Sequence, residues 1–456
     1  MNPFRNIYDS VPQSTARSNI PNWLIYFLIL IAIITSVIFY LFPFQNSFLT
    51  DEKVAKVYFA DNITKAHIEL IDIFNEKYKG KIEVIPVDIP TVKFTTNKRK
   101  ELITRTLRSR NSRIDIFAID QIWIPRFAKW AEPLENYFSE NELEKLLPQA
   151  IETCIYNDSL FAVPFFIDVG VMYYRKDLIE KLNDAEEIEN KLKKGITWEE
   201  LIKLKDKNLP KNYLYVFQGD AYEGLICNYI EILGANEGNI YSNGKFNVYN
   251  PSTVASAQKL VDFIYKYKIS PKEVAGFDES GAYEYALEND VPFFRGWPTT
   301  IKYSNLVSKT TNKLNLLEAV PLPKNLSSHS TSAIGGWNFI LSRFSSVKEE
   351  AVTFIKFVLS RKIQELNYKS GSYLPILKIF YTDKNIINEY PRLGNFNNII
   401  TNGLHRPSDY NYTKISDVLS TYLNKALKKE LSVDEALKSA QAQINIIINL
   451  SFENEQ

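Results

Sequence analysis

An almost uncharged run in the middle of the chain predicts a buried strand. Leu160–Leu178 reads LFAVPFFIDVGVMYYRKDL, without the three-to-four-residue period of an amphipathic helix and with breaks at Pro164 and Gly170. Asp168 is the one charge inside its apolar part, and burying a carboxylate is costly unless it is paired or faces water. We therefore expect the chain to cross between two lobes here, with Asp168 facing the gap; a strand-end aspartate in water is the alternative.

Strand and helix patterns alternate at the start of the large polar part of the chain. Strand-like segments occur at 54–60, 82–87 and 113–119, and a helical pattern separates the first two. This order predicts βαβ units and a parallel sheet. Pockets of such sheets form at the carboxyl ends of strands. The candidates for a cleft wall there are Asp61, Asn62, Asp120 and Trp123.

Local signals divide the remainder of the chain into further helices and strands, including a strand at 213–217. Ser or Thr followed three residues later by Glu predicts capping boxes at 197–200, 346–349 and 432–435. The apolar segment 333–340 contains Gly335 and Gly336, which allow backbone torsions and close approaches that other residues resist. We expect this segment to be the second crossing between lobes, with the two glycines as its hinge.

The amino-terminal region predicts a membrane anchor. Residues 23–42 (WLIYFLILIAIITSVIFYLF) carry no charge, and a helix of that length spans a hydrocarbon core of about 30 Å. Arg5 and Arg17 precede the run, which favours a cytoplasmic location for 1–22. We expect 23–43 to form an uncleaved single-pass anchor in the cell membrane, with the carboxyl-terminal domain extracytoplasmic.

Composition excludes several classes of function. The chain has 456 residues, long enough for two lobes, and its 54 basic residues nearly cancel its 53 acidic ones, so no net charge recruits nucleic acid. The three histidines are scattered and no nucleotide-binding motif occurs, so we expect neither metal nor cofactor. Cys154 and Cys227 fit either one disulfide or two separate buried thiols.

Motif-like segments follow one another over nearly the whole predicted extracytoplasmic part. They are Arg113–Leu134, Leu160–Leu178, Thr197–Leu201, Phe293–Trp297, Pro321–Pro323, Ala333–Leu359, Gly371–Pro375 and His405–Pro407 with the final helix. In this order they resemble the family 1 extracellular solute-binding proteins, the maltose-binding-like receptors of ABC importers. The resemblance implies an α/β, two-lobed fold of the type II periplasmic-binding-protein kind. It places 51–165 with 335–374 in the first lobe and 166–334 with 375–456 in the second.

The resemblance also implies where a ligand would bind, in a cleft that closes by hinge motion. The implied contacts are Asp61, Asn62, Asp120, Asp168, Asp220, Tyr222, Gly296, Trp297 and Trp337. Residue chemistry agrees with a sugar, because aromatic rings suit its C–H faces and carboxylates suit its hydroxyls. Trp123 is a further candidate platform. For each tryptophan, packing in the core is the alternative.

Three functions are compatible with these features. The first is a tethered protein that captures a sugar or oligosaccharide, without enzymatic activity, and delivers it to the permease subunits of an ABC importer. The second is a membrane-tethered sugar sensor that uses the same fold. The third is a glycosidase with two of the aspartates as its catalytic pair.

Overall fold

The computed structural model describes residues 21–41, 54–90, 96–110, 113–207, 209, 213–299, 311–325 and 329–453. The chain forms two units, Met1–Lys53 and Val54–Gln456. In the first, helix α1 (Asn22–Leu41) is described, with side chains given for 22–24 and 26–35. No helix among the fully described residues is long and apolar enough to cross a membrane. The predicted span 23–43 is therefore not supported, and nearly all of segment 1–22 lies outside the described residues.

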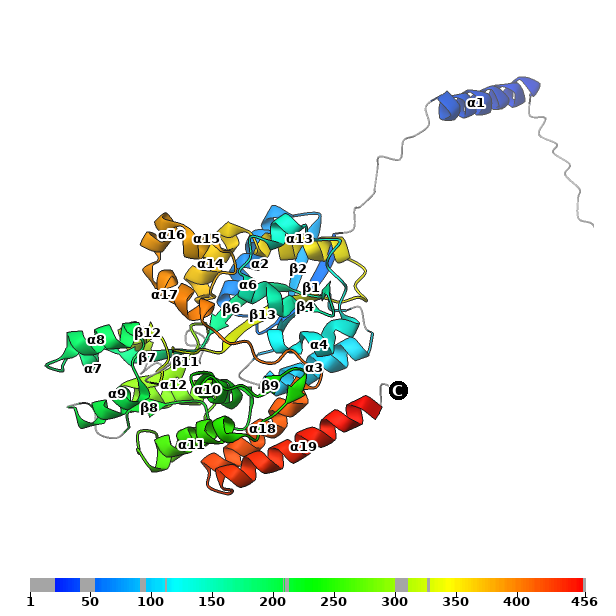
Figure 1. The fold of residues 1–456 in the computed structure, drawn as a ribbon. Coiled ribbons are helices and arrows are strands. Elements are labelled where there is room, and N and C mark those ends of the chain that lie inside the picture. The colour runs from blue at the N-terminus through cyan, green and yellow to red at the C-terminus, as the bar shows by residue number, and fades with distance from the viewer. Residues whose placement is uncertain are drawn as a thin grey trace, which may run out of the picture. The chain divides into compact units, whose positions relative to one another are not determined.

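The first lobe of Val54–Gln456 is built on a five-stranded sheet of order β2-β1-β3-β13-β6 (Figure 1). Its strands are β1 (Ala55–Asp61), β2 (Ile82–Asp88), β3 (Ile116–Asp120), β6 (Val163–Val169) and β13 (Ile334–Leu341). β1 is parallel to β2 and β3, whereas β13 is antiparallel to β3 and β6. The helices of this lobe are α2 (Lys65–Lys77), α3 (Thr96–Arg108), α4 (Ile124–Phe127), α5 (Glu140–Leu143), α6 (Pro148–Ile151), α13 (Lys348–Val358) and α14 (Arg361–Gly371).

The second lobe is built on a four-stranded sheet of order β12-β7-β11-β8. Its strands are β7 (Val171–Arg175), β8 (Tyr215–Val216), β11 (Phe293–Gly296) and β12 (Leu317–Val320). Its helices are α7 (Lys176–Ile179), α8 (Ala185–Lys194), α9 (Trp198–Lys203), α10 (Glu223–Gly234), α11 (Pro251–Tyr265), α12 (Glu279–Glu288), α18 (Tyr412–Leu427) and α19 (Val433–Glu453). Two short hairpins complete the described strands: β4 (Ile155–Tyr156) with β5 (Ser159–Leu160), and β9 (Tyr241–Ser242) with β10 (Lys245–Phe246).

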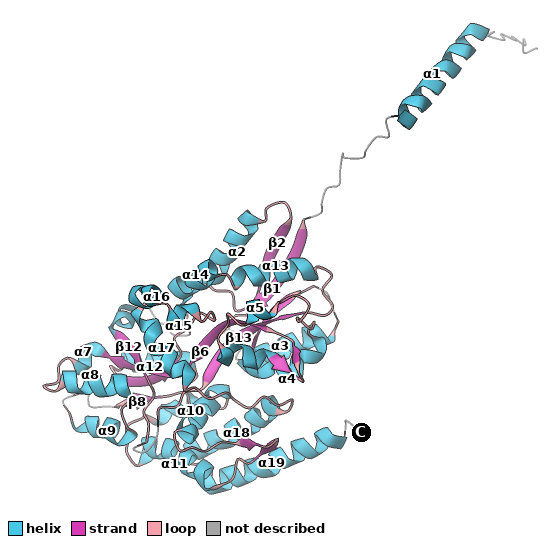
Figure 2. Cartoon of the chain, turned by 45° about the horizontal axis from the view of Figure 1, so that its top comes forward, coloured by secondary structure: helices cyan, strands magenta, loops and turns pink. Residues whose placement is uncertain are grey.

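Three helices follow the first lobe's α14 along the chain: α15 (Ile379–Thr382), α16 (Lys384–Glu389) and α17 (Pro391–Thr401). They lie beside α14 in both ribbon views (Figures 1 and 2). The Leu147 N–H donates to the Ile376 carbonyl at 2.8 Å, and the Tyr390 hydroxyl donates to Glu365 of α14 at 2.9 Å. Helix α18 packs instead on α10 and α11, and α19 packs on α11 and α18. The residues just after the predicted lobe boundary at 374/375 therefore bond to the first lobe, and the boundary itself stays a prediction.

The run Leu160–Leu178 provides one connection between the sheets. All seven residues of β6 and all five of β7 are buried, as the absence of helical periodicity predicts, and the chain changes sheet at Gly170. The second connection lies between β12 and β13. Gly335 and Gly336 fall inside β13, so the change of sheet precedes them.

Helix caps follow local sequence where packing allows it. Thr197 and Glu200 form the predicted capping box of α9, and Ser432 and Glu435 exchange the same bonds at the start of α19. The box predicted at 346–349 is wrong. Helix α13 begins at Lys348 with Val347 at its cap position and no side-chain capping bond.

Candidate functional site

The point where the two connections meet is held by a buried ion pair. The Gly170 N–H donates to the Ala333 carbonyl at 3.0 Å. Ala333 N–H in turn donates to Glu231 Oε1 at 3.1 Å, and Arg295 donates to the same carboxylate at 2.7 and 3.2 Å. Glu231 lies in α10 and Arg295 in β11, so second-lobe side chains fix both connections. We call Gly170, Ala333, Glu231 and Arg295 the junction.

Asp168 and Trp297 lie beside the junction. Asp168 is paired with Gly335 across β6 and β13. The Trp297 ring lies over the same glycine, because a Cβ on Gly335 would be 2.9 Å from its Cζ3 atom. The Arg295 guanidinium lies 3.8 Å from the centre of that ring. Three predicted residues from separate parts of the chain, Asp168, Trp297 and Gly335, are thus brought together.

Burial dominates the ionisation of Asp168. Its side chain is buried, and desolvation raises its pKa from 3.8 to about 7. The Thr299 hydroxyl, the Val169 N–H and the positive charge of Arg295 act in the opposite direction but do not cancel the effect. Near neutral pH this carboxyl can therefore donate a hydrogen bond as well as accept one.

This pKa predicts a pH-dependent contribution to stability. The folded protein keeps the Asp168 proton up to pH about 7, whereas the unfolded chain releases it near pH 3.8. The contribution of Asp168 to the free energy of unfolding therefore falls as the pH rises from 3.8 to about 7. We expect the free energy of unfolding, measured by urea denaturation, to fall less between pH 5 and 8 in Asp168→Asn than in wild type. Asp206→Asn, at an exposed position, is the control. Equal pH slopes for Asp168→Asn and wild type would contradict the prediction.

A second ion-pair cluster joins the two lobes directly. Arg406, in the segment between α17 and α18, donates to Asp120 at the end of β3 at 2.9 Å and to Glu223 at the start of α10 at 3.1 Å. All three are buried. Tyr412 donates to Glu223 at 2.8 Å, and Ser416 also bonds to it. Arg406 is therefore a bridge between a first-lobe and a second-lobe carboxylate.

Asp61 and Trp337 share one cationic partner in the first lobe. Arg99 donates to Asp61 Oδ1 at 2.7 Å, and its guanidinium lies 4.2 Å from the centre of the Trp337 ring. His67 Nε2 lies 3.2 Å from the other Asp61 oxygen. Trp337 also faces Asp120 across β13 and β3. Asp61 and Asp120, two of the carboxylates at the predicted ligand contacts, are thus bonded to protein cations.

The other predicted ligand contacts have different surroundings in the structure. Trp123 is 1% exposed and packs against Phe127 and the edge of Trp337, so its ring is part of the core. Tyr222 is buried over Gly224 at the start of α10. Asp220 accepts from the next backbone N–H at 2.8 Å, and the Asn62 N–H donates to Asp61 at 2.6 Å. Trp123 therefore packs in the core, which is the alternative given above for each tryptophan.

The sequence reasoning missed five charged residues that organise these clusters: Arg99, Glu223, Glu231, Arg295 and Arg406. The signal for Arg295 was present. It is a charge inside the apolar run 291–297, as Asp168 is inside Leu160–Leu178. Glu223 and Glu231 are likewise charges in a helix, α10, whose residues are all buried. Nothing local marked Arg99.

The clusters described above consist of carboxylates, guanidinium groups and aromatic rings. Among the described residues no three His, Cys, Asp or Glu side chains form a group that could hold a metal ion. Cys154 and Cys227 are both free and buried, so they form no disulfide with each other. Desolvation raises the pKa of both thiols. Neither is therefore activated as a nucleophile.

Known proteins of similar sequence and fold are solute-binding proteins. The model of the family "Bacterial extracellular solute-binding protein" matches residues 55–365. A probable ABC transporter-binding protein of Deinococcus radiodurans is 26% identical, over 76% of this chain and 83% of its own. The maltose-bound structure of T. maritima MalE3 has a TM-score of 0.75 at 27% identity, covering 86% of this chain and 100% of that one.

A more distant structure supports the fold alone. A solute-binding protein of Agrobacterium radiobacter K84, solved with ribitol, has a TM-score of 0.71 at 20% identity and covers 85% of this chain and 98% of its own. The match to the family model spans both sheets and both connections described above. The chain therefore belongs to the bacterial extracellular solute-binding protein family, with that family's two-lobed α/β fold.

Proposed function

We propose that this protein captures a sugar or oligosaccharide outside the cytoplasm and delivers it to the permease subunits of an ABC importer. The observation that carries the proposal is the placement of Asp168 and Trp297 around Gly335, where the two lobes are connected. An indole ring beside a carboxyl is suited to the C–H face and hydroxyls of a pyranose. The likeness to maltose-bound MalE3 supports the same ligand class.

Ligand capture on this proposal proceeds by hinge motion. Asp168 and Trp297 are only 6% and 8% exposed, so a ligand reaches them after the lobes separate. Gly335 and Gly336 are proposed to flex together with Gly170, since they adjoin the change of sheet. Closure then buries the ligand between the lobes, and opening at the permease releases it.

Calorimetric titration with a panel of mono- and oligosaccharides tests this function. We expect one sugar to bind at micromolar or tighter affinity, a free energy of about −8 kcal/mol, without turnover. Trp297→Ala should weaken that binding at least tenfold because the platform is lost. Tyr249→Ala, which removes an exposed second-lobe aromatic, should leave it unchanged. No heat with any sugar, or equal affinities for Trp297→Ala and wild type, would contradict the proposal.

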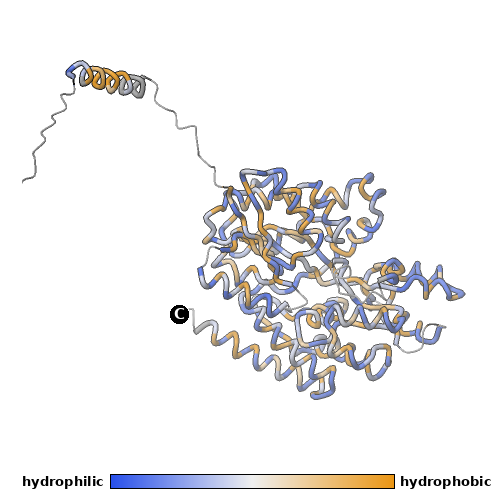
Figure 3. The backbone as a smooth tube through the Cα atoms, turned by 180° about the vertical axis from the view of Figure 1, so that it is seen from behind, coloured by the Kyte–Doolittle hydropathy of each residue, from blue (hydrophilic) through white to orange (hydrophobic). Residues whose placement is uncertain are grey.

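We further propose that the protein is held at the cell membrane by residues 23–43. This proposal rests on the sequence, because residues 23–42 carry no charge, and the described part of α1 is mainly hydrophobic (Figure 3). Carbonate extraction of cells producing the full chain tests this. Retention in the membrane pellet, with residues 54–456 open to external protease, is expected. Recovery of the intact chain in the soluble fraction would refute the anchor while leaving sugar capture standing.

A further inference from the structure

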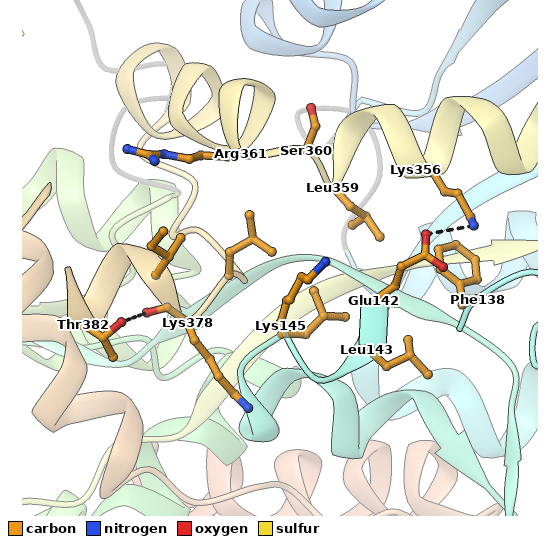
Figure 4. Close-up of a pocket in the computed structure, with 13 residues that line it drawn as sticks. Phe138, Glu142, Leu143, Lys145, Lys356, Leu359, Ser360, Arg361, Lys378 and Thr382 are labelled. Carbon is orange, nitrogen blue, oxygen red and sulfur yellow. Dashed lines mark hydrogen bonds and ion pairs between the residues drawn. The ribbon is translucent and has the colours of Figure 1, made fainter. Parts of the chain in front are cut away.

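The first lobe has an open groove away from the junction. It has a volume of about 620 Å³ and lies between α5, the α13–α14 turn and α15 (Figure 4). None of the junction residues, the Arg406 bridge or the Arg99 cluster lines it. Small-molecule sites in proteins usually measure about 300 to 1,000 Å³. The groove is therefore of a size that holds one small ligand, and nothing in the sugar-binding proposal uses it.

Apolar side chains form most of the groove's lining. They come from the segment around α5, from the end of α13 and from the start of α15: Phe138, Leu143, Leu146, Leu359, Leu377 and Ile379. Ile379 is 37% exposed, which costs free energy in water. The Lys378 N–H donates to the Lys145 carbonyl at 3.0 Å, so backbone bonds fix two of the walls relative to each other. The fold therefore holds these walls of the groove in place.

The charged side chains that line the groove carry a net positive charge. Glu142, the one carboxylate in the lining, is bonded to Lys356 at 2.8 Å (Figure 4). That bond and the Ser139 cap bonds lower the pKa of Glu142 to about 2 against the opposing effect of desolvation. Lys145, Arg361 and Lys378 have no ion-pair partner within the described parts of the chain. Glu365, one turn along α14 from Arg361, is bonded to Lys369 and Tyr390.

We infer that this groove binds a single-chain amphiphile with a carboxylate head, such as a medium-chain fatty acid. The acyl chain would cover the leucines. The head would meet the ammonium group of Lys145, which lies beside Leu359 and Glu142, whereas Arg361 and Lys378 lie apart from it and add to the positive charge of the groove (Figure 4). A neutral sugar has no chain for the leucines. An acidic amphipathic helix offers the same chemistry but needs a longer surface than a groove of this volume gives.

Photo-crosslinking to the full chain tests the inference and locates the ligand. A decanoate analogue with a diazirine near the chain end is used below its micelle-forming concentration, with mass spectrometry of the products. We expect labels within 138–146 and 356–382, with competition by plain decanoate but not by decyltrimethylammonium, which has the same tail and opposite charge. Labels confined to 22–41, or equal competition by both amphiphiles, would overturn it.

Charge reversal provides a matched second measurement. Lys145→Glu with Lys378→Glu should weaken decanoate binding at least tenfold, whereas Lys194→Glu, an exposed cation on α8, should not change it. Because Lys145 is exposed and Lys378 is only half-buried, folding should survive. Sugar binding should be unaffected in all variants. A protein that binds no sugar would therefore contradict the proposed function but not the fatty-acid site. Unchanged decanoate affinity in the double variant, or capture of an acidic helical peptide in place of decanoate, would refute a fatty-acid site.

Discussion

Arg406→Met is expected to destabilise the protein by about 3 to 5 kcal/mol, because it removes one partner of a buried ionic cluster and leaves two buried carboxylates uncompensated. Methionine keeps much of the side-chain length, so the loss is mainly electrostatic. Asp120 and Glu223 lie in different lobes, and without the guanidinium they repel each other. We therefore also expect the lobes to separate. Urea denaturation measures the first effect, and the radius of gyration from small-angle X-ray scattering measures the second.

The chain offers a matched control for this experiment. Arg392 donates to Glu318 at 3.2 Å, but both side chains are exposed, at 62% and 37%. Exposed pairs contribute about 0 to 1 kcal/mol, so Arg392→Met should be nearly neutral. Asp120→Asn in the Arg406→Met background should recover part of the loss, because it removes one unpaired charge. If Arg406→Met and Arg392→Met cost the same, Arg406 does not bridge the lobes.

Gly170→Ala is expected to cost about 1 to 3 kcal/mol through overpacking at the junction. The new Cβ would overlap Glu231 Oε1 and lie 2.7 Å from Arg295 Nη2. Neither group can withdraw freely, because Glu231 also accepts from the Ala333 N–H and Arg295 stacks on Trp297. The loss of stability should therefore come with weaker sugar binding. Thermal unfolding and calorimetry on the same samples measure the two.

A second glycine separates this packing effect from a general effect of glycine replacement. A Cβ on Gly276 would meet no atom within 4 Å, so Gly276→Ala should stay within about 0.5 kcal/mol of wild type. Adding Glu231→Ala to Gly170→Ala should relieve the overlap and recover less than the full loss, since Arg295 then loses its partner. A neutral Gly170→Ala would mean that the two connections are not held as tightly as the contacts indicate.

The elements of the fold follow from short-range patterns that the sequence carries. The aperiodic apolar run Leu160–Leu178 predicts strand, and β6 and β7 are there, completely buried. The boxes at 197–200 and 432–435 cap helices because each side chain reaches a backbone group only three residues away. The order of such segments along the chain was enough to predict the two-lobed family. At 346–349 the same local rule failed, since α13 starts at Lys348 without a side-chain cap.

The candidate site was predicted in part, where a residue conflicted with its local surroundings. Asp168 stood out because a charge in an apolar run needs a reason, and it lies with Trp297 at Gly335. Trp123 had no such conflict, and its place at the end of a strand did not distinguish a cleft wall from the core where its ring packs. Gly335 and Gly336 were marked by composition, but the change of sheet falls just before them.

The sequence by itself determined the kinds of element and their order, and it marked Asp168 as a charge in an apolar run that had to be explained. Only the tertiary structure decided which side chains pair with one another in the buried ion pairs. Arg406 lies 286 residues from Asp120 and 183 from Glu223, and Arg295 lies 64 from Glu231. No local pattern encodes these pairings, because a salt bridge depends on distance in space and on the exclusion of water, and both are set only when the two sheets and their helices have packed.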